Sequence, residues 1–69
     1  MGAPILAWFA HDHLPAGPAR EVSRMFHALA HELDDRLPAG AETSTALRKL
    51  LEGKDAAVRA ALDVPKETV

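Results

Sequence analysis

The proline and glycine at residues 38–41 divide the periodic part of the chain into two amphipathic stretches. Before this break, apolar residues recur every three or four positions, at Val22, Met25, Phe26, Leu29, Leu33 and Leu37. After it they recur at Leu47, Leu50, Leu51, Ala57, Val58, Ala61 and Leu62. These steps place one apolar stripe on each of two helices. The sequence therefore predicts helices over residues 18–37 and 42–62, each about 30 Å long.

The ends of both predicted helices carry signals of their own. Gly17 can cap the first helix, and Pro18 suits its first position. Pro38 ends that helix and Gly40 supplies conformational freedom in the turn. Glu42 places a carboxylate at the positive end of the second helix. Helices of equal length joined by a short turn predict an antiparallel helical hairpin.

The first 17 residues are expected to form an N-terminal arm of a different kind. Pro4, Pro15 and Gly17 rule out a continuous helix, and the apolar residues 5–9 are interpreted as a short strand or an extended peptide. Trp8 and Phe9 lie in this segment, and a partner subunit is the expected cover for their large rings. The predicted fold is all-α, with an extended arm at 1–17, a helical hairpin domain at 18–62 and a short tail at 63–69.

A single hairpin of this size buries too little apolar surface to be stable alone. The chain has 69 residues and no cysteine, and chains this short usually need disulfides, a metal or oligomerisation. Small residues lie on a face beside the second apolar stripe, at Ala46, Gly53, Ala57 and Ala60. Alanine is a good helix former in any case, but a glycine in mid-helix costs about 1 kcal/mol, so close approach of another helix is the preferred reading. We expect a homo-oligomer.

The charge and the N-terminal sequence restrict the partners and the location. A net charge of −2 argues against bulk binding of DNA or RNA, which normally needs a basic surface. The apolar start is interrupted by Pro4, lacks a basic region and is too short to span a bilayer. We therefore expect a soluble intracellular protein without a membrane segment.

The sequence contains no set of residues that indicates catalysis. It has no nucleophile–base motif, no phosphate-binding loop and no dinucleotide fingerprint, so we expect a protein that is not an enzyme and carries no cofactor. His11, Asp12 and His13 are adjacent, and His27 and His31 are four residues apart, a spacing that can bind zinc. The first group lacks a strong third ligand, the second lacks the Glu beside its first His that a zinc-protease helix carries, and solvated histidines are the preferred reading.

A basic stripe follows the first helix opposite its apolar residues. Arg20, Arg24, His27 and His31 step by four, three and four positions. This stripe is either a solvated face or a surface for an anion, because Arg presents a planar fork to phosphate and His can add charge or stack on a base.

Three basic residues of the second helix lie within or beside its apolar stripe. Lys54 falls within the apolar stripe, where it either reaches out to solvent or lines a polar pocket between subunits. Arg48 and Arg59 are spaced to form ordinary ion pairs with Glu52 and Asp55.

Three segments in order, FAHDHLP, VSRMFHALAHELDDRLP and ETSTALRKLLEGKDAAVRAAL, resemble the phage anti-CBASS and anti-Thoeris sponge family. The similarity covers roughly residues 9–62. Its elements are a proline-containing aromatic arm, an LA core in the first helix, a proline turn and an AL-K-LE-like start to the second helix. The resemblance implies helical hairpins assembled as homohexamers in the host cytoplasm. Such proteins bind cyclic di- or trinucleotides, or cyclic ADP-ribose isomers, without cleaving them.

The resemblance also implies positions for a ligand site. The arm position that carries a base-stacking aromatic, usually Tyr, corresponds here to His11, with Trp8 and Phe9 close by. The phosphate-contacting basic residue of the first helix corresponds to Arg24. A second, trinucleotide site in some members uses a basic residue where this chain has Asp63, with Arg59 one turn earlier.

Together with the stripe and the possible pocket, the expected ligand-binding residues are His11, Arg24, Trp8, Phe9, His27, Lys54 and Arg59. The alternative function is an oligomeric structural or regulatory phage protein that acts through protein–protein contacts.

Overall fold

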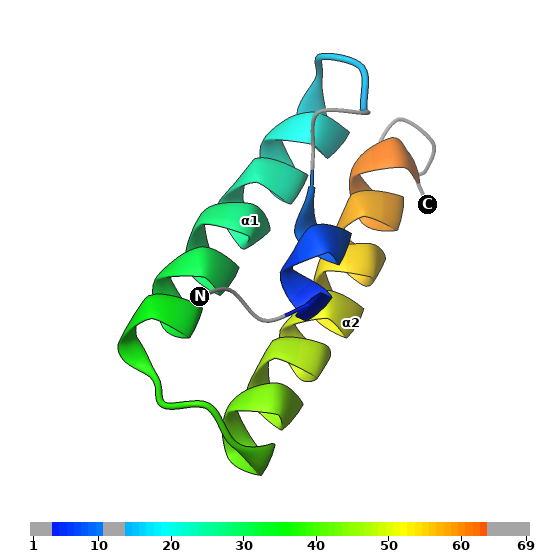
Figure 1. Cartoon of the computed structure of the whole chain (residues 1–69). Helices are drawn as coiled ribbons and strands as arrows, with labels where there is room; N and C mark the ends of the chain where they lie inside the picture. The colour runs from blue at the N-terminus through cyan, green and yellow to red at the C-terminus, as the bar shows by residue number, and fades with distance from the viewer. Residues whose placement is uncertain (1–3, 11–13, 64–69) are drawn as a thin grey trace.

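The computed structural model describes residues 4–10 and 14–63, the last of these by its backbone only. This part of the chain is all-helical and contains no strand. A short 3₁₀-helix, η1 (Pro4–Phe9), precedes two long helices, α1 (Pro18–Arg36) and α2 (Ala41–Asp63). Figure 1 shows α1 and α2 side by side and antiparallel, with η1 lying over the groove between them. The predicted pair of packed helices is confirmed.

The observed helix ends follow the chemistry of the residues found there. Gly17 precedes Pro18 with a φ of 141°, a backbone conformation that glycine adopts easily, and its carbonyl accepts a bond of 3.0 Å from the Glu21 N–H. At the other end, Leu37 is extended, as expected for a residue before proline, and its N–H donates to the Leu33 carbonyl at 2.9 Å. The Gly40 carbonyl accepts from the Ser44 N–H at 3.0 Å, which begins α2.

The arm differs from the prediction of a strand or an extended peptide, because its residues 4–9 form η1. A proline at the first position starts this helix as it can start an α-helix. Leu6 and Phe9, three residues apart, are its two buried residues. Since a 3₁₀-helix has three residues per turn, that spacing brings both side chains to the face that packs on the hairpin.

The core lies where the three helices meet. Leu6 and Phe9 of η1 pack with Ala30 of α1 and Leu47 of α2, all of them buried. Partly buried apolar residues surround this cluster: Ile5, Phe26, Leu33, Leu50 and Leu51. The chain itself therefore covers the Phe9 ring, for which a partner subunit was the expected cover.

The inward face of α1 differs from its predicted apolar stripe. Its buried residues are Ala19, Ser23 and Ala30, whereas Met25 and Leu29 are exposed. Small residues face inward because they let α2 and η1 approach the α1 backbone closely. The larger apolar residues are therefore divided between the core, which takes Phe26 and Leu33, and the surface.

Charged pairs on the outer faces are few and exposed in the described part of the chain. The Arg36 guanidinium lies 3.0 Å from the Glu32 carboxylate, and Lys49 Nζ lies 3.8 Å from Glu52. Glu52 thus pairs with Lys49, and the predicted partnership with Arg48 is not formed. Neither long helix has a stretch that is both apolar and long enough to cross a bilayer.

Candidate functional site

Three of the expected ligand-binding residues meet where η1 crosses α2. The Phe9 ring is fully buried, at 0% exposure, while the neighbouring Trp8 side chain is 70% exposed. Lys54 on α2 is only 8% exposed, and its ammonium donates to the Trp8 backbone carbonyl at 3.1 Å. This bond satisfies a carbonyl at the end of η1, where backbone acceptors lack helical partners.

These positions divide the three residues by role. Phe9 and Lys54 hold η1 against the hairpin, and neither presents a free surface to a ligand in this structure. Lys54 points inward rather than reaching out to solvent, which had been one of its two interpretations. The exposed Trp8 ring can stack on a flat group, because an indole offers a large apolar face at its surface.

The basic stripe of α1 is present as a continuous edge of the helix. Arg24 and His31 are exposed, while Arg20 and His27 are half-buried. The rings of His27 and His31 lie 4.3 Å apart and are tilted by 44°. Among the described residues, no ion pair involves Arg24. Its guanidinium can therefore form a bidentate contact with an external phosphate.

Two buried polar atoms of α1 were not anticipated from the sequence. Ser23 is completely buried, and the structure describes no hydrogen-bond partner for its Oγ or for the Arg20 Nε. Helical periodicity is compatible with a buried Ser23, because Ser23 lies four residues after Ala19 and seven before Ala30 and so shares their face of α1. It was missed because serine is usually a surface residue.

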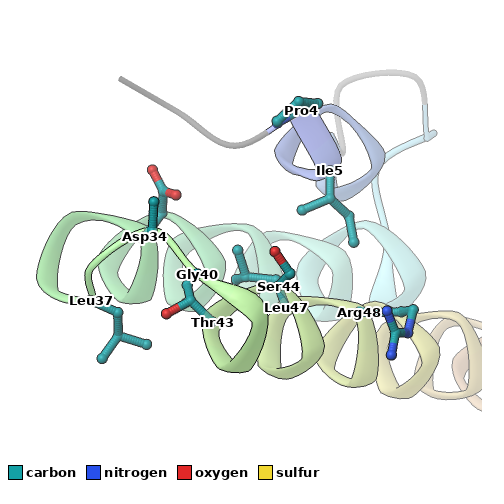
Figure 2. A pocket seen from close by; sticks show the side chains of 10 residues that line it. Pro4, Ile5, Asp34, Leu37, Gly40, Thr43, Ser44, Leu47 and Arg48 are labelled. Atoms are coloured by element: carbon teal, nitrogen blue, oxygen red, sulfur yellow. The ribbon is translucent and has the colours of Figure 1, made fainter.

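A cleft of about 600 Å³ lies between η1 and the closed end of the hairpin. Figure 2 shows Ile5 reaching from η1 towards Ser44 and Leu47 on α2, with Asp34 and Arg48 at opposite ends. Its full lining is Pro4, Ile5, Asp34, Leu37, Ala39, Gly40, Thr43, Ser44, Leu47 and Arg48. The volume suits a small molecule. No described residue of the expected ligand-binding set lines this cleft. The sequence patterns did not predict it, because one of its walls is η1, whose position on the hairpin they do not determine.

The remaining expected site residues are separate from this cleft. Arg59 is exposed on the outer side of α2. His11, together with the neighbouring Asp12 and His13, lies outside the described residues. Within the described ranges, no three His, Asp or Glu side chains are grouped closely enough to hold a metal ion.

Comparisons with known proteins do not assign the chain to a family. No protein-family model, no curated protein and no solved structure matches it. The functional interpretation therefore depends on the residues, on the geometry described above and on the family resemblance of the sequence.

Proposed function

We propose that this protein binds cyclic oligonucleotide messengers without cleaving them and acts as a homo-oligomer that keeps them from their effector. The observation that carries the proposal is the exposed basic edge of α1, with Arg24 unpaired among the described residues. On a chain with a net charge of −2, this local edge suits a small anion better than a long nucleic acid.

The phosphate and the base of such a ligand require different groups. Arg24 supplies the planar, permanently charged fork for a phosphate. The Trp8 ring, 70% exposed, is available to stack on a base, which is how nucleotides are held without reading a groove. His27 belongs to this basic edge, Arg59 is a candidate for a second site, and His11 is proposed as the arm contact by the resemblance alone.

A symmetric assembly suits a cyclic ligand. A cyclic dinucleotide has two phosphates and two flat bases related by near two-fold symmetry. An interface between identical copies presents the same arginine and aromatic ring twice. The proposed assembly is therefore part of the site, and a hexamer is the form that the family resemblance implies.

Calorimetry against cyclic di- and trinucleotides and cyclic ADP-ribose isomers tests this function. We expect binding at micromolar protein, with the nucleotide recovered intact after the protein is denatured. Arg24→Ala removes a charged hydrogen bond of about 1.5–3 kcal/mol and should weaken binding about 10- to 100-fold. Arg36→Ala is the matched control, because Arg36 is another exposed arginine of α1 and it pairs with Glu32.

Two results would count against the proposal. One is the absence of binding heat for every nucleotide of the panel. The other is an equal loss of affinity in Arg24→Ala and Arg36→Ala. If the oligomer forms but binds no nucleotide, the alternative of a structural or regulatory protein gains support.

A further inference from the structure

Two large apolar side chains of α1 are exposed on the face of the hairpin opposite η1, beside the exposed Glu32–Arg36 pair. Met25 is 70% exposed and Leu29 is 44% exposed. Successive residues of a helix are turned by about 100°. Viewed down the axis of α1, the buried Ala30 is therefore turned from Phe26 towards η1. Leu29 and Met25 are turned from Phe26 in the opposite direction, away from η1. Together they form a ridge along the outer surface of α1.

The same face carries small residues on α2. Lys54 points towards η1, where it bonds to the Trp8 carbonyl, so the preceding residue, Gly53, is turned away from η1 by about 100°. A Cβ on Gly53 would lie 3.7 Å from the Phe26 ring, which places Gly53 level with Phe26. Ala46 and Ala57 are on this side of α2 by helical spacing, and Gly53 and Ala46 are exposed.

We infer that this face, the Met25 face (Met25 and Leu29 of α1 with Ala46, Gly53 and Ala57 of α2), packs against the same face of a second copy. The inference rests on the proposed function only for the existence of an oligomer. It concerns a different interface from the one proposed to hold the ligand, because Trp8 belongs to η1 and the Met25 face lies on the opposite side.

The shape of the face identifies a second copy as the occupant. One half carries large side chains and the other half small ones, so a two-fold axis parallel to the helices sets each ridge against the other copy's small residues. Such an axis keeps every residue at its own level along the hairpin. Met25 of one copy then lies over Gly53 of the other, where the missing side chain lets the helices approach closely.

The broad side that carries this face is comparable in size to a standard interface. A standard interface buries about 800 Å² on each partner. The molecule is a slab of 42 × 23 × 15 Å, and the Met25 face belongs to one of its broad sides. η1 covers the opposite broad side (Figure 1), and no element that the structure describes covers this one. The interface would thus add the second layer that a two-helix layer lacks.

The oligomeric state of Met25→Glu, measured by light scattering without nucleotide, tests the interface. The matched control is Leu62→Glu. Leu62 is 63% exposed, but it lies outside the Met25 face, beside Pro15 and Ala16 near the end of α2. We expect the wild type and Leu62→Glu to keep the same mass and Met25→Glu to fall to half of it or less. An unchanged mass for Met25→Glu, or equal dissociation of both variants, would overturn the inference.

Disulfide trapping keeps the test decisive if Met25→Glu does not fold. The chain has no cysteine, so single cysteines report only the designed contact. Chains with Met25→Cys and Gly53→Cys are mixed and oxidised, and we expect a linked heterodimer in high yield, since a disulfide needs Cα atoms within about 7 Å. A yield no higher than that of Met25→Cys mixed with Leu62→Cys would refute the contact. Because no nucleotide is present, failure here is distinct from failure to bind a ligand.

Discussion

Replacement of Phe9 by alanine tests how the arm is attached to the hairpin. The Phe9 ring is completely buried against both long helices. Removing a fully buried phenylalanine side chain costs about 3–5 kcal/mol. A domain of this length has a total stability of only about 3–10 kcal/mol. Phe9→Ala should therefore remove a third or more of the free energy of unfolding and release η1 from the groove.

Trp8→Ala is the matched control, because Trp8 and Phe9 are adjacent aromatic residues of η1 that differ in burial. The Trp8 side chain is 70% exposed, and the group that accepts from Lys54 is its backbone carbonyl, which alanine keeps. We expect Trp8→Ala to change stability by less than about 1 kcal/mol, in the range of surface substitutions.

Urea unfolding followed by circular dichroism measures both variants. At about 4–8 °C per kcal/mol for a small domain, Phe9→Ala should also lower Tm by at least about 12 °C. All samples need the same protein concentration, since oligomerisation makes stability depend on it. Equal losses in the two variants, or a larger loss in Trp8→Ala, would refute the placement of Phe9 inside and Trp8 outside.

Two further substitutions test buried polar groups by the same unfolding assay. Lys54→Ala loses the bond to the Trp8 carbonyl and the packing of the lysine stem, so we expect the free energy of unfolding to fall by about 2–3 kcal/mol. The control, Lys49→Ala, removes an exposed ion pair and should cost under about 0.5 kcal/mol. Equal effects of the two substitutions would contradict the role of Lys54. Ser23→Ala removes a buried hydroxyl with no described partner and should raise stability by about 1 kcal/mol. The exposed Ser44→Ala should be neutral, and destabilisation by Ser23→Ala would show that its hydroxyl is bonded.

Local chemistry was sufficient to predict the two long helices. Pro18 begins α1 as expected, and α1 ends at Arg36, one residue before the predicted end. The bounds of α2, Ala41–Asp63, lie one residue outside the predicted range at each end. Proline, glycine and the apolar period act within a few residues, so a single sequence carries this information.

The arm and the division of the apolar residues could not be predicted in the same way. The spacing of Leu6 and Phe9 is compatible with a 3₁₀-helix, but a segment this short forms one only because the hairpin groove receives both side chains. The apolar period of α1 likewise allowed Met25 and Leu29 to face inward. Contacts with η1 and α2 decide that Ala30 and Ser23 occupy the interior instead.

The predicted site residues divide between the surface and the interior, and which of them bind a ligand stays a prediction. Arg24 and Trp8 lie at the surface, where a ligand can reach them. Phe9 was expected near the ligand from the family resemblance, and Lys54 from its place in the apolar stripe. Their tertiary contacts give both residues structural roles. The cleft beside Ile5 and Arg48 exists only when η1 is in place, so no local pattern could reveal it.

Native mass spectrometry after incubation with a mixture of cyclic nucleotides tests the proposed function most directly. It reports the number of copies and the mass of any bound molecule in one spectrum. We expect a homo-oligomer that carries an intact cyclic nucleotide and loses it when Arg24 is replaced by alanine. A single copy of the chain, or an oligomer whose mass does not change at saturating nucleotide, would contradict the proposal.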